Sequence, residues 1–355
     1  GSSGGGSTAG TTFTLSSSAD TGSAFTGTSN DDTYVAQIAG DLATGTTLNA
    51  GDSLSGREGT DTLIVSIAGA STAAVTSAAV TLAGVEKVLA SNFDSNTDDT
   101  EDNDFDASLW TGVTTVGLSA SNATGDTSFS NLGNIVAAEM STGSGDLTLS
   151  YLSTVVEGTE DVQALKVSGL TAGTFTADAN VETVAITSST VASTLAALTA
   201  TGATKLTIAG DKLLTVTGAI GTTMKTIDAS ASTGGVSLVL GTADLTVTGG
   251  SGNDTIRIDG GTVDTNDSIN AGTGTDSLQL TAAVTTAANG ARLAGFENAY
   301  IYQDAAATAT VTQDVSLLSG ITNVGVTKMT YTDDNDGVAD AATITSAFTG
   351  MSATQ

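Results

Sequence analysis

One block of glycine, asparagine and aspartate constrains this chain more than any other feature of its sequence. The complete copy reads Thr248-Gly249-Gly250-Ser251-Gly252-Asn253-Asp254-Thr255-Ile256, which fits the nonapeptide Gly-Gly-x-Gly-x-Asp-x-apolar-x at every defined position. Glycine allows tight turns that direct backbone carbonyls inward, and aspartate adds an anionic oxygen. Ca2+ prefers six to eight oxygen ligands, and this nonapeptide is typical of calcium-binding parallel β-rolls.

A degraded copy of the block lies near the start of the chain, as Thr26-Gly27-Thr28-Ser29-Asn30-Asp31-Asp32-Thr33-Tyr34. A second block follows each copy with its acids at the same spacing. Asp52-Ser53-Leu54 leads to Gly59-Thr60-Asp61, and Asp267-Ser268-Ile269 leads to Gly274-Thr275-Asp276. Further along, Leu82-Ala83-Gly84-Val85-Glu86 matches Leu293-Ala294-Gly295-Phe296-Glu297. Three matched blocks in the same order indicate two related modules.

Charge and composition exclude several classes of function. The 355 residues contain 38 acids and 9 bases, a formal net charge of −29. Without a basic stripe, nucleic-acid binding is not expected, and an anionic membrane surface would repel the chain. Such a charge destabilises a compact fold by self-repulsion unless cations offset it. Bound calcium would supply that offset where the acids cluster.

Three residue types are missing: cysteine, histidine and proline. Disulfides, thiolate metal sites, zinc–histidine sites and Ser-His-Asp triads are therefore excluded. No apolar run approaches the roughly 20 residues that span a bilayer, so membrane insertion is not expected. A mean hydropathy of +0.16 and regularly spaced valine and leucine argue against a disordered chain.

Short strand-like segments separated by small residues recur along most of the chain. Their spacing favours an all-β parallel solenoid or β-roll with calcium-binding Gly/Asp turns, in preference to a β-sandwich. The Ala-rich segments 68–83 and 281–296 are expected to be short helical insertions. The predicted organisation is a flexible linker over 1–11, a first calcium-motif module over 12–110, a β-solenoid over 111–246, and a second calcium-motif module with a C-terminal β region over 247–355.

Two acidic segments lie outside the matched blocks. Residues 94–106 hold seven acids, and such a run is expected to be a solvated loop, with a calcium-ordered loop as the alternative. Residues 331–337 form an acidic turn that resembles an EF-hand loop only superficially. With Gly337 as the turn glycine, the twelfth position is Thr343 and the bidentate glutamate is missing.

The modules resemble bacterial surface-layer proteins with RTX-type calcium repeats, of the Caulobacter-like kind exported by type I secretion. The likeness lies in residues 25–35, in Asp52 with 59–63, and in the stretch from Lys225 to Asp254. It implies Ca2+ bound between consecutive turns by motif aspartates and loop carbonyls. In the first module the implied ligands are Asp32, Asp52, Asp61, Gly27, Gly56 and Gly59. In the second module they are Gly249, Gly250, Gly252, Asp254, Asp267, Gly272, Gly274 and Asp276.

Several positions depart from a regular repeat. Arg57 and Glu58 replace a glycine and a small residue, and Ala271 replaces a first glycine. The alternative for each aspartate is an Asx-turn that caps its own backbone. Glu86 and Glu297 are expected to be structural carboxylates at the start of strands, with a ligand role left open. Trp110 is expected to close a solenoid end or to pack locally.

We expect a secreted structural protein of the cell surface, not an enzyme, whose folding and self-assembly into a lattice or sheath depend on Ca2+. Copies of the chain are the expected partners, with cell-surface polysaccharide or lipopolysaccharide as a further one. The alternative is a calcium-stabilised adhesin or biofilm-matrix protein that binds glycans or surfaces, for which Phe296, Tyr300 and Tyr302 are the candidate aromatic group. A β-helix enzyme acting on acidic polysaccharide is disfavoured because bases are scarce.

Overall fold

Neighbouring strands pair in parallel and build a β-solenoid of about 13 turns, which confirms the predicted fold class. The computed structural model describes residues 9–39, 45–69, 75–77, 79–95, 103–259, 263–305, 309–331 and 344–352. The chain divides into two compact units. The first comprises Gly1–Thr187 and Ser193–Ala203, and the second comprises Ser188–Ala192 and Thr204–Gln355. One turn of the solenoid is called a rung below.

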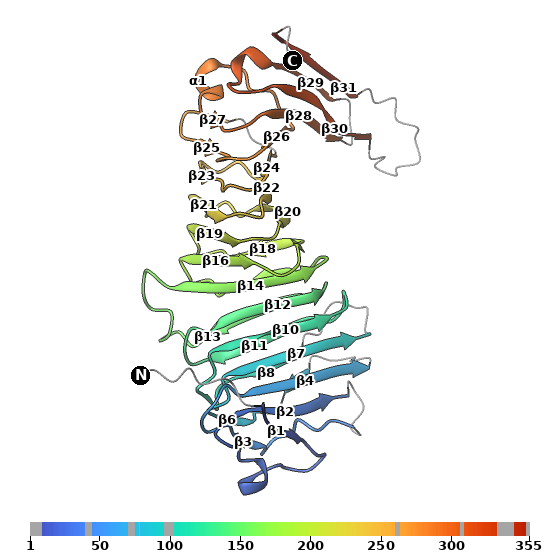
Figure 1. The fold of residues 1–355 in the computed structure, drawn as a ribbon, viewed down its shortest axis with the longest axis vertical. Helices are drawn as coiled ribbons and strands as arrows, with labels where there is room; N and C mark the ends of the chain where they lie inside the picture. The colour runs from blue at the N-terminus through green and yellow to red at the C-terminus, as the bar shows by residue number, and fades with distance from the viewer. Residues whose placement is uncertain are drawn as a thin grey trace. The chain divides into compact units, whose positions relative to one another are not determined.

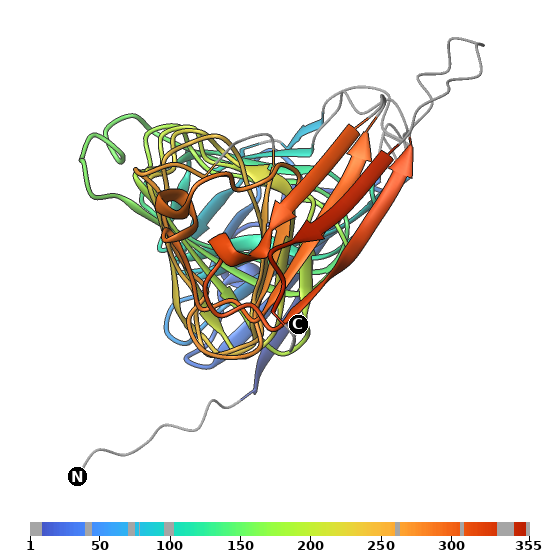
Figure 2. The same cartoon turned by 90° about the horizontal axis from the view of Figure 1, so that it is seen from above.

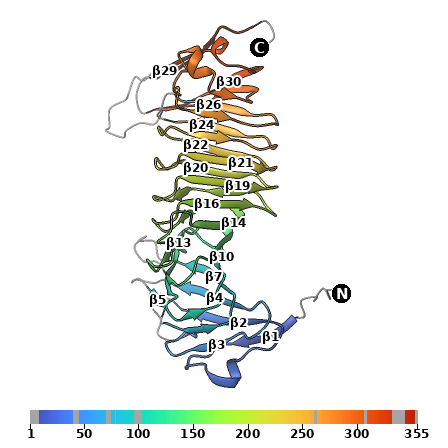
Figure 3. The ribbon, with the colours of Figure 1, turned by 90° about the vertical axis from the view of Figure 1, so that its left-hand side faces the viewer.

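The first unit stacks its rungs along three sheets (Figure 1, Figure 3). Their strand orders are β1-β2-β4-β7-β10-β12-β14-β16, β18-β15-β13-β11-β8-β5 and β3-β6-β9. The elements are β1 (Ala9–Thr14), 3-10 helix η1 (Gly22–Phe25), β2 (Asp31–Ile38), β3 (Ser53–Ser55), β4 (Thr62–Gly69), β5 (Val75–Ser77), β6 (Thr81–Ala83), β7 (Lys87–Asp94), β8 (Asn103–Asp106), β9 (Trp110–Thr111), β10 (Thr115–Ser121), β11 (Thr127–Leu132), β12 (Ala137–Gly143), β13 (Leu147–Tyr151), β14 (Val162–Leu170), β15 (Thr174–Thr176), β16 (Thr183–Ser188), β17 (Ser193–Leu195) and β18 (Ala197–Thr199).

The second unit continues this plan in the orders β19-β21-β23-β25-β27 and β20-β22-β24-β26-β28-β30, with β29 paired to β31. Figure 2 shows β28 to β31 side by side at its C-terminal end. The elements are β19 (Lys205–Gly210), β20 (Leu214–Ile220), β21 (Thr226–Ser232), β22 (Val236–Leu240), β23 (Thr246–Thr248), β24 (Thr255–Ile258), β25 (Ser268–Asn270), β26 (Ser277–Leu280), α1 (Ala287–Gly290), β27 (Leu293–Ala294), β28 (Asn298–Ala305), β29 (Ala309–Asp314), 3-10 helix η2 (Val315–Leu317), β30 (Asn323–Tyr331) and β31 (Ile344–Thr349).

Alternating side chains explain why these segments form strands around a narrow core. In β4, Leu63, Val65 and Ile67 are buried, whereas the residues between them face outward. Each rung sets its apolar residues over those of the next, as where Leu63 pairs with Val88. Because aliphatic side chains supply nearly all of this core, hydrophobic burial along the stack is the main stabilising term.

Alanine-rich sequence did not produce the helix expected over 68–83. The described part of this segment ends β4 and forms β5 and β6, which pair with β8 and β3. Valine and threonine in Val75-Thr76-Ser77 and Thr81-Leu82-Ala83 suit strands, and pairing to neighbouring rungs overrides the helix propensity of alanine. In 281–296 the helix is limited to α1, where the Thr286 hydroxyl accepts a hydrogen bond from the Asn289 amide at 3.2 Å.

Two other segments differ from expectation. Residues 9–11, assigned to the flexible linker, already belong to β1. Within the acidic run 94–106, Asp94 ends β7 and residues 103–106 form β8, so these ends are not loop. The alternation Asn-Asp-Phe-Asp buries Phe105 and pairs with β11. Residues 96–102 and 332–337 lie outside the described residues.

Candidate metal centre

The complete nonapeptide begins a ladder of carboxylates that links successive rungs. The Asp254 amide donates to Oδ1 of Asp276 at 2.7 Å, and the Asp276 amide donates to Oε2 of Glu297 at 2.8 Å. The two oxygens of Asp254 accept hydrogen bonds from the amides of Val236 at 2.8 Å and Gly250 at 3.0 Å. These three acids lie where β24, β26 and β28 begin, and we call them the second ladder.

The degraded copy forms the same arrangement, the first ladder, at the start of β2, β4 and β7. The Asp32 amide donates to Oδ1 of Asp61 at 2.6 Å, and the Asp61 amide donates to Oε2 of Glu86 at 2.7 Å. The amides of Thr11 and Thr28 donate to the two oxygens of Asp32. Glu86 and Glu297 are therefore carboxylates at strand starts, as expected, and each accepts the amide of the preceding rung.

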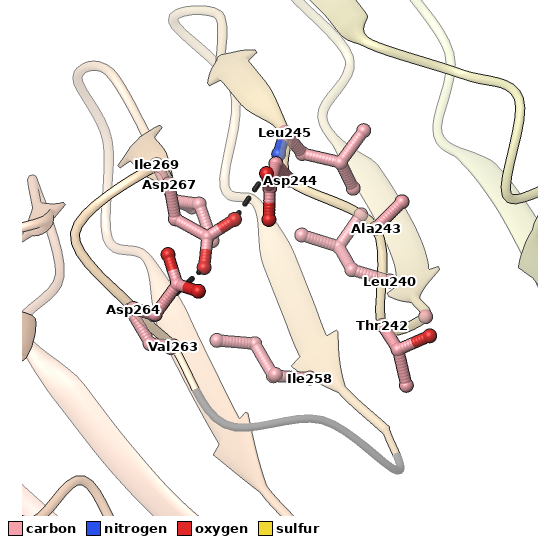
Figure 4. A pocket seen from close by; sticks show the side chains of 11 residues that line it. Leu240, Thr242, Ala243, Asp244, Leu245, Ile258, Val263, Asp264, Asp267 and Ile269 are labelled. Carbon is pink, nitrogen blue, oxygen red and sulfur yellow. Dashed lines mark hydrogen bonds between the residues drawn. The ribbon is translucent and has the colours of Figure 1, made fainter.

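Asp52 and Asp267 cap turns and stand outside the two ladders. Each has both oxygens bonded by backbone amides. The donors to Asp267 are Leu245 at 3.1 Å and Asp264 at 2.9 Å, beside a small pocket of about 30 Å³ (Figure 4). The donors to Asp52 are Asp20 at 2.8 Å and Asn49 at 2.7 Å. The local donors lie three residues before each aspartate, whereas an Asx-turn uses the amide two residues later, so neither the Asx-turn nor the metal role is confirmed for these two residues.

One oxygen in each ladder differs from the rest. Oδ2 of Asp61 and Oδ2 of Asp276 are buried and have no hydrogen-bond partner, and both side chains are 0% exposed. A buried carboxylate oxygen without a donor is costly. Burial raises the pKa of Asp61 to about 6, helped by the charges of Glu86 and Asp32 and opposed by the Asp32 amide. Burial likewise raises the pKa of Asp276 to about 6, helped by Asp254 and Glu297.

The glycines of the blocks allow a close approach of backbone and carboxylate oxygens. A Cβ at Gly56 would overlap the carbonyl oxygen of Gly84 and Oδ2 of Asp61. At Gly249 it would overlap the carbonyl of Ala271 and lie 2.6 Å from Oδ2 of Asp254. The other predicted glycines also face backbone of a neighbouring rung: Gly27 meets Gly56, Gly59 meets Asn30, Gly250 meets Ser232, Gly252 meets Gly235, Gly272 meets Gly250, and Gly274 meets Gly252.

These contacts decide which residues fit a bound cation. Among the described residues, no three Asp or Glu side chains gather as a metal-binding group. The pairs Asp61–Glu86 and Asp276–Glu297 nevertheless combine an unpartnered buried oxygen, a second carboxylate and nearby main-chain carbonyls. Hard oxygen donors of this kind are those that Ca2+ prefers. The fit is best for these two pairs, while Asp32 and Asp254 already have amide donors on both oxygens.

The structure contains a third ladder, formed by Asp161 and Glu182, which was not predicted from the sequence. The Asp161 amide donates to Oε2 of Glu182 at 2.8 Å, and Oδ2 of Asp161 is buried without a hydrogen-bond partner. The amides of Glu182 and Thr183 bond the Asp161 carbonyl, as Glu86 and Lys87 bond that of Asp61. The available signal was the pattern apolar-Glu-x-apolar in Val181-Glu182-Thr183-Val184, which repeats Val85-Glu86-Lys87-Val88 and Phe296-Glu297-Asn298-Ala299.

No protein-family model matches the sequence, and no curated protein is similar to it. Within the described residues, no helix combines the length and the apolar character that a membrane span requires.

Proposed function

We propose that this chain is a structural protein of an extracellular surface assembly, and that Ca2+ stabilises its acidic solenoid turns. The observation that carries the proposal is the unpartnered buried oxygen of Asp61 and of Asp276, at equivalent positions of two modules. A net charge of −29 adds a second reason, because the folded chain needs cations to offset its self-repulsion.

Within this proposal the first ladder would hold a cation through Asp61 and Glu86, and the second ladder through Asp276 and Glu297. Carbonyl oxygens of the glycine turns would complete the ligand set. The bound ion would supply positive charge where two carboxylates meet. Ca2+ is scarce in cytosol and abundant outside cells, so the chain would order fully after export, and binding energy would add to folding energy.

Thermal unfolding followed by circular dichroism tests this role of calcium. We expect Ca2+ to raise the unfolding midpoint and Mg2+ to have little effect, since Mg2+ demands stricter geometry. A ligand at 100 times its dissociation constant adds about 2.7 kcal/mol. The variant D61N/D276N should lose most of this gain. Equal midpoints in chelator and in Ca2+ would contradict the proposal.

A matched control separates specific binding from general charge reduction. Asp106 and Asp228 belong to no ladder, and each accepts a hydrogen bond from the amide two residues later, at 3.0 Å in both cases. One lies in each unit. The variant D106N/D228N therefore removes the same charge as D61N/D276N and should keep the full response to Ca2+. If both variants lose it equally, the ladders are not the binding sites.

A further inference from the structure

The outer face of β24, β26, β28 and β30 carries an in-register row of polar and aromatic residues. Arg257 pairs with Gln279, Gln279 with Tyr300, and Tyr300 with Gly325, on four consecutive strands. The first three side chains are half-buried, whereas the residues on either side of them in the strands are buried in the core. A Cβ at Gly325 would lie 3.1 Å from the Tyr300 ring, so this ring rests over the glycine.

Two cations converge beside this row. The guanidinium carbon of Arg257 lies 4.3 Å from the ring centroid of Tyr302, and Nζ of Lys328 lies 5.4 Å from the same centroid. Arg257 also pairs with Asp259 at 3.3 Å, while its buried Nε has no hydrogen-bond partner. The chain has only nine lysines and arginines. Two of these nine residues lie beside one tyrosine, on strands far apart in sequence. The local charge here is therefore opposite in sign to the net charge of the chain.

Acids border this face at Asp259, which pairs with Arg257, and at Asp304, but the strand segments between them carry none. The segments 255–258, 277–280, 298–303 and 323–328 contain no Asp or Glu. Phe296, the third residue of the expected aromatic group, is 2% exposed and takes no part. The surface is thus aromatic, with two cations and one bordering acid beside Tyr302.

We propose that this face docks an acidic turn of a second copy of the chain; the inference rests on the self-assembly proposed above. A copy carries 38 acids, so most approaches between two copies are repulsive. Here an incoming carboxylate would meet two cations, Lys328 and Arg257, against the single acid Asp259 that pairs with Arg257, beside a tyrosine ring. Arginine binds carboxylates in bidentate fashion, and Tyr and Arg dominate the energetics of protein interfaces. Because its charge is complementary to an acidic turn, this face attracts a second copy of the chain.

Charge reversal tests the assignment by sedimentation velocity in Ca2+-containing buffer. We expect R257E/K328E to weaken self-association by about tenfold or more. The matched control is K205E/K225E, which changes net charge equally at exposed lysines of the same unit. The control should associate nearly as the native protein does. Equal weakening in both variants, or in neither, would overturn the proposal.

Two further measurements keep the outcomes distinct. Because Arg257 is partly buried, the single variant K328E accompanies the double variant, and circular dichroism checks that both fold. If Ca2+ raises the unfolding midpoint while R257E/K328E associates normally, the docking face is wrong and the calcium role stands. The last experiment measures how strongly the native protein and R257E/K328E are retained on an acidic polysaccharide resin. If R257E/K328E abolishes that retention and leaves self-association intact, the partner is a saccharide and the second-copy assignment is overturned.

Discussion

The first and second ladders form the same hydrogen bonds from different sequences. Both run from an aspartate to an aspartate to a glutamate at three successive strand starts. Around them, Thr28 and Asn30 stand where the complete copy has Gly250 and Gly252. The ladder therefore depends on a carboxylate at each strand start, because that group accepts the amide of the preceding rung. The glycine consensus controls how closely neighbouring turns approach.

The backbone conformations sharpen this comparison. Arg57 has φ of +74° where the second module has Gly272 with φ of +96°. Gly84 and Gly295 match in the same way, at +63° and +74°. The left-handed turn is thus kept even where the residue is arginine, which is costly for a residue with a Cβ. Rung geometry, set by the hydrogen bonds on either side, prevails over local preference.

The largest expected change in the free energy of unfolding comes from a substitution at Gly56, whose counterpart in the second module is Ala271. Gly56→Ala should destabilise the first unit by about 3 kcal/mol, because its Cβ would overlap backbone and carboxylate oxygens. Ala271→Gly should cost only about 1 kcal/mol. Trp110 is the only tryptophan and lies in the first unit, so denaturation followed by its fluorescence reports Gly56→Ala directly. An unchanged midpoint would show that the first module has as much room as the second.

Removing the middle carboxylate should cost about 2 kcal/mol in either ladder. Asp61→Ala leaves the buried Asp32 amide without its acceptor, and Asp276→Ala does the same to Asp254. Tryptophan fluorescence should detect only the destabilisation caused by Asp61→Ala. Hydrogen exchange of the β24 and β26 amides should detect the destabilisation caused by Asp276→Ala. Asparagine at either position retains an acceptor and should cost less. If only one of the two substitutions lowers stability, the two ladders are not equivalent.

The calcium-free protein should lose stability as pH rises between about 4 and 6. Asp61 and Asp276 have a pKa near 3.8 when unfolded and about 6 when folded, so the folded state binds protons more tightly. That stabilisation is complete below about pH 4 and is lost as pH rises through about 6. Each carboxylate contributes on the order of 1 kcal/mol. Denaturation at pH 4.5 and pH 7 measures it, and D61N/D276N should flatten the difference; an equal slope in the variant would contradict the assignment.

The smallest effect concerns the strained turn. Arg57→Gly should stabilise the first unit by about 0.5 kcal/mol, because relief of the left-handed strain slightly exceeds the entropy that glycine loses on folding. Tryptophan fluorescence in urea measures the shift. If Arg57→Gly destabilises the unit instead, the arginine side chain makes a contribution that its exposed position does not indicate.

Much of the fold could be predicted because apolar alternation marks the strands. For example, apolar residues alternate with polar ones in Lys205–Ile208 and Leu147–Leu149 and dominate Val236–Leu240, and these segments form part of β19, part of β13 and β22. Which sheet each strand joins was beyond the sequence, since that depends on how many residues fill each turn. The equivalent Asp32 and Asp254 accordingly lie at the start of β2 and directly before β24, two strands that the strand order assigns to different sheets.

The sequence located the acids of the first and second ladders but did not show how they pair. Matching blocks located Asp61, Asp276, Glu86 and Glu297, yet pairing each aspartate with its glutamate required the length of one rung, which varies. Asp161 was missed because Gly158-Thr159-Glu160-Asp161 carries one residue more than Gly59-Thr60-Asp61 between its glycine and its aspartate. Burial of a single oxygen atom has no signature in sequence at all, because it depends on the rungs above and below.

The one-rung reach of the ladder bonds has a consequence for how such a chain can change over evolutionary time. Each acid is bonded to the equivalent position of its neighbour, so a duplicated or deleted whole turn leaves compatible surfaces at the new junction. A gain of a few residues within a turn would instead displace every acid beyond it. Genes for proteins of this kind should therefore grow and shrink in coil-sized steps, and the matched blocks near both ends of this chain fit such a history.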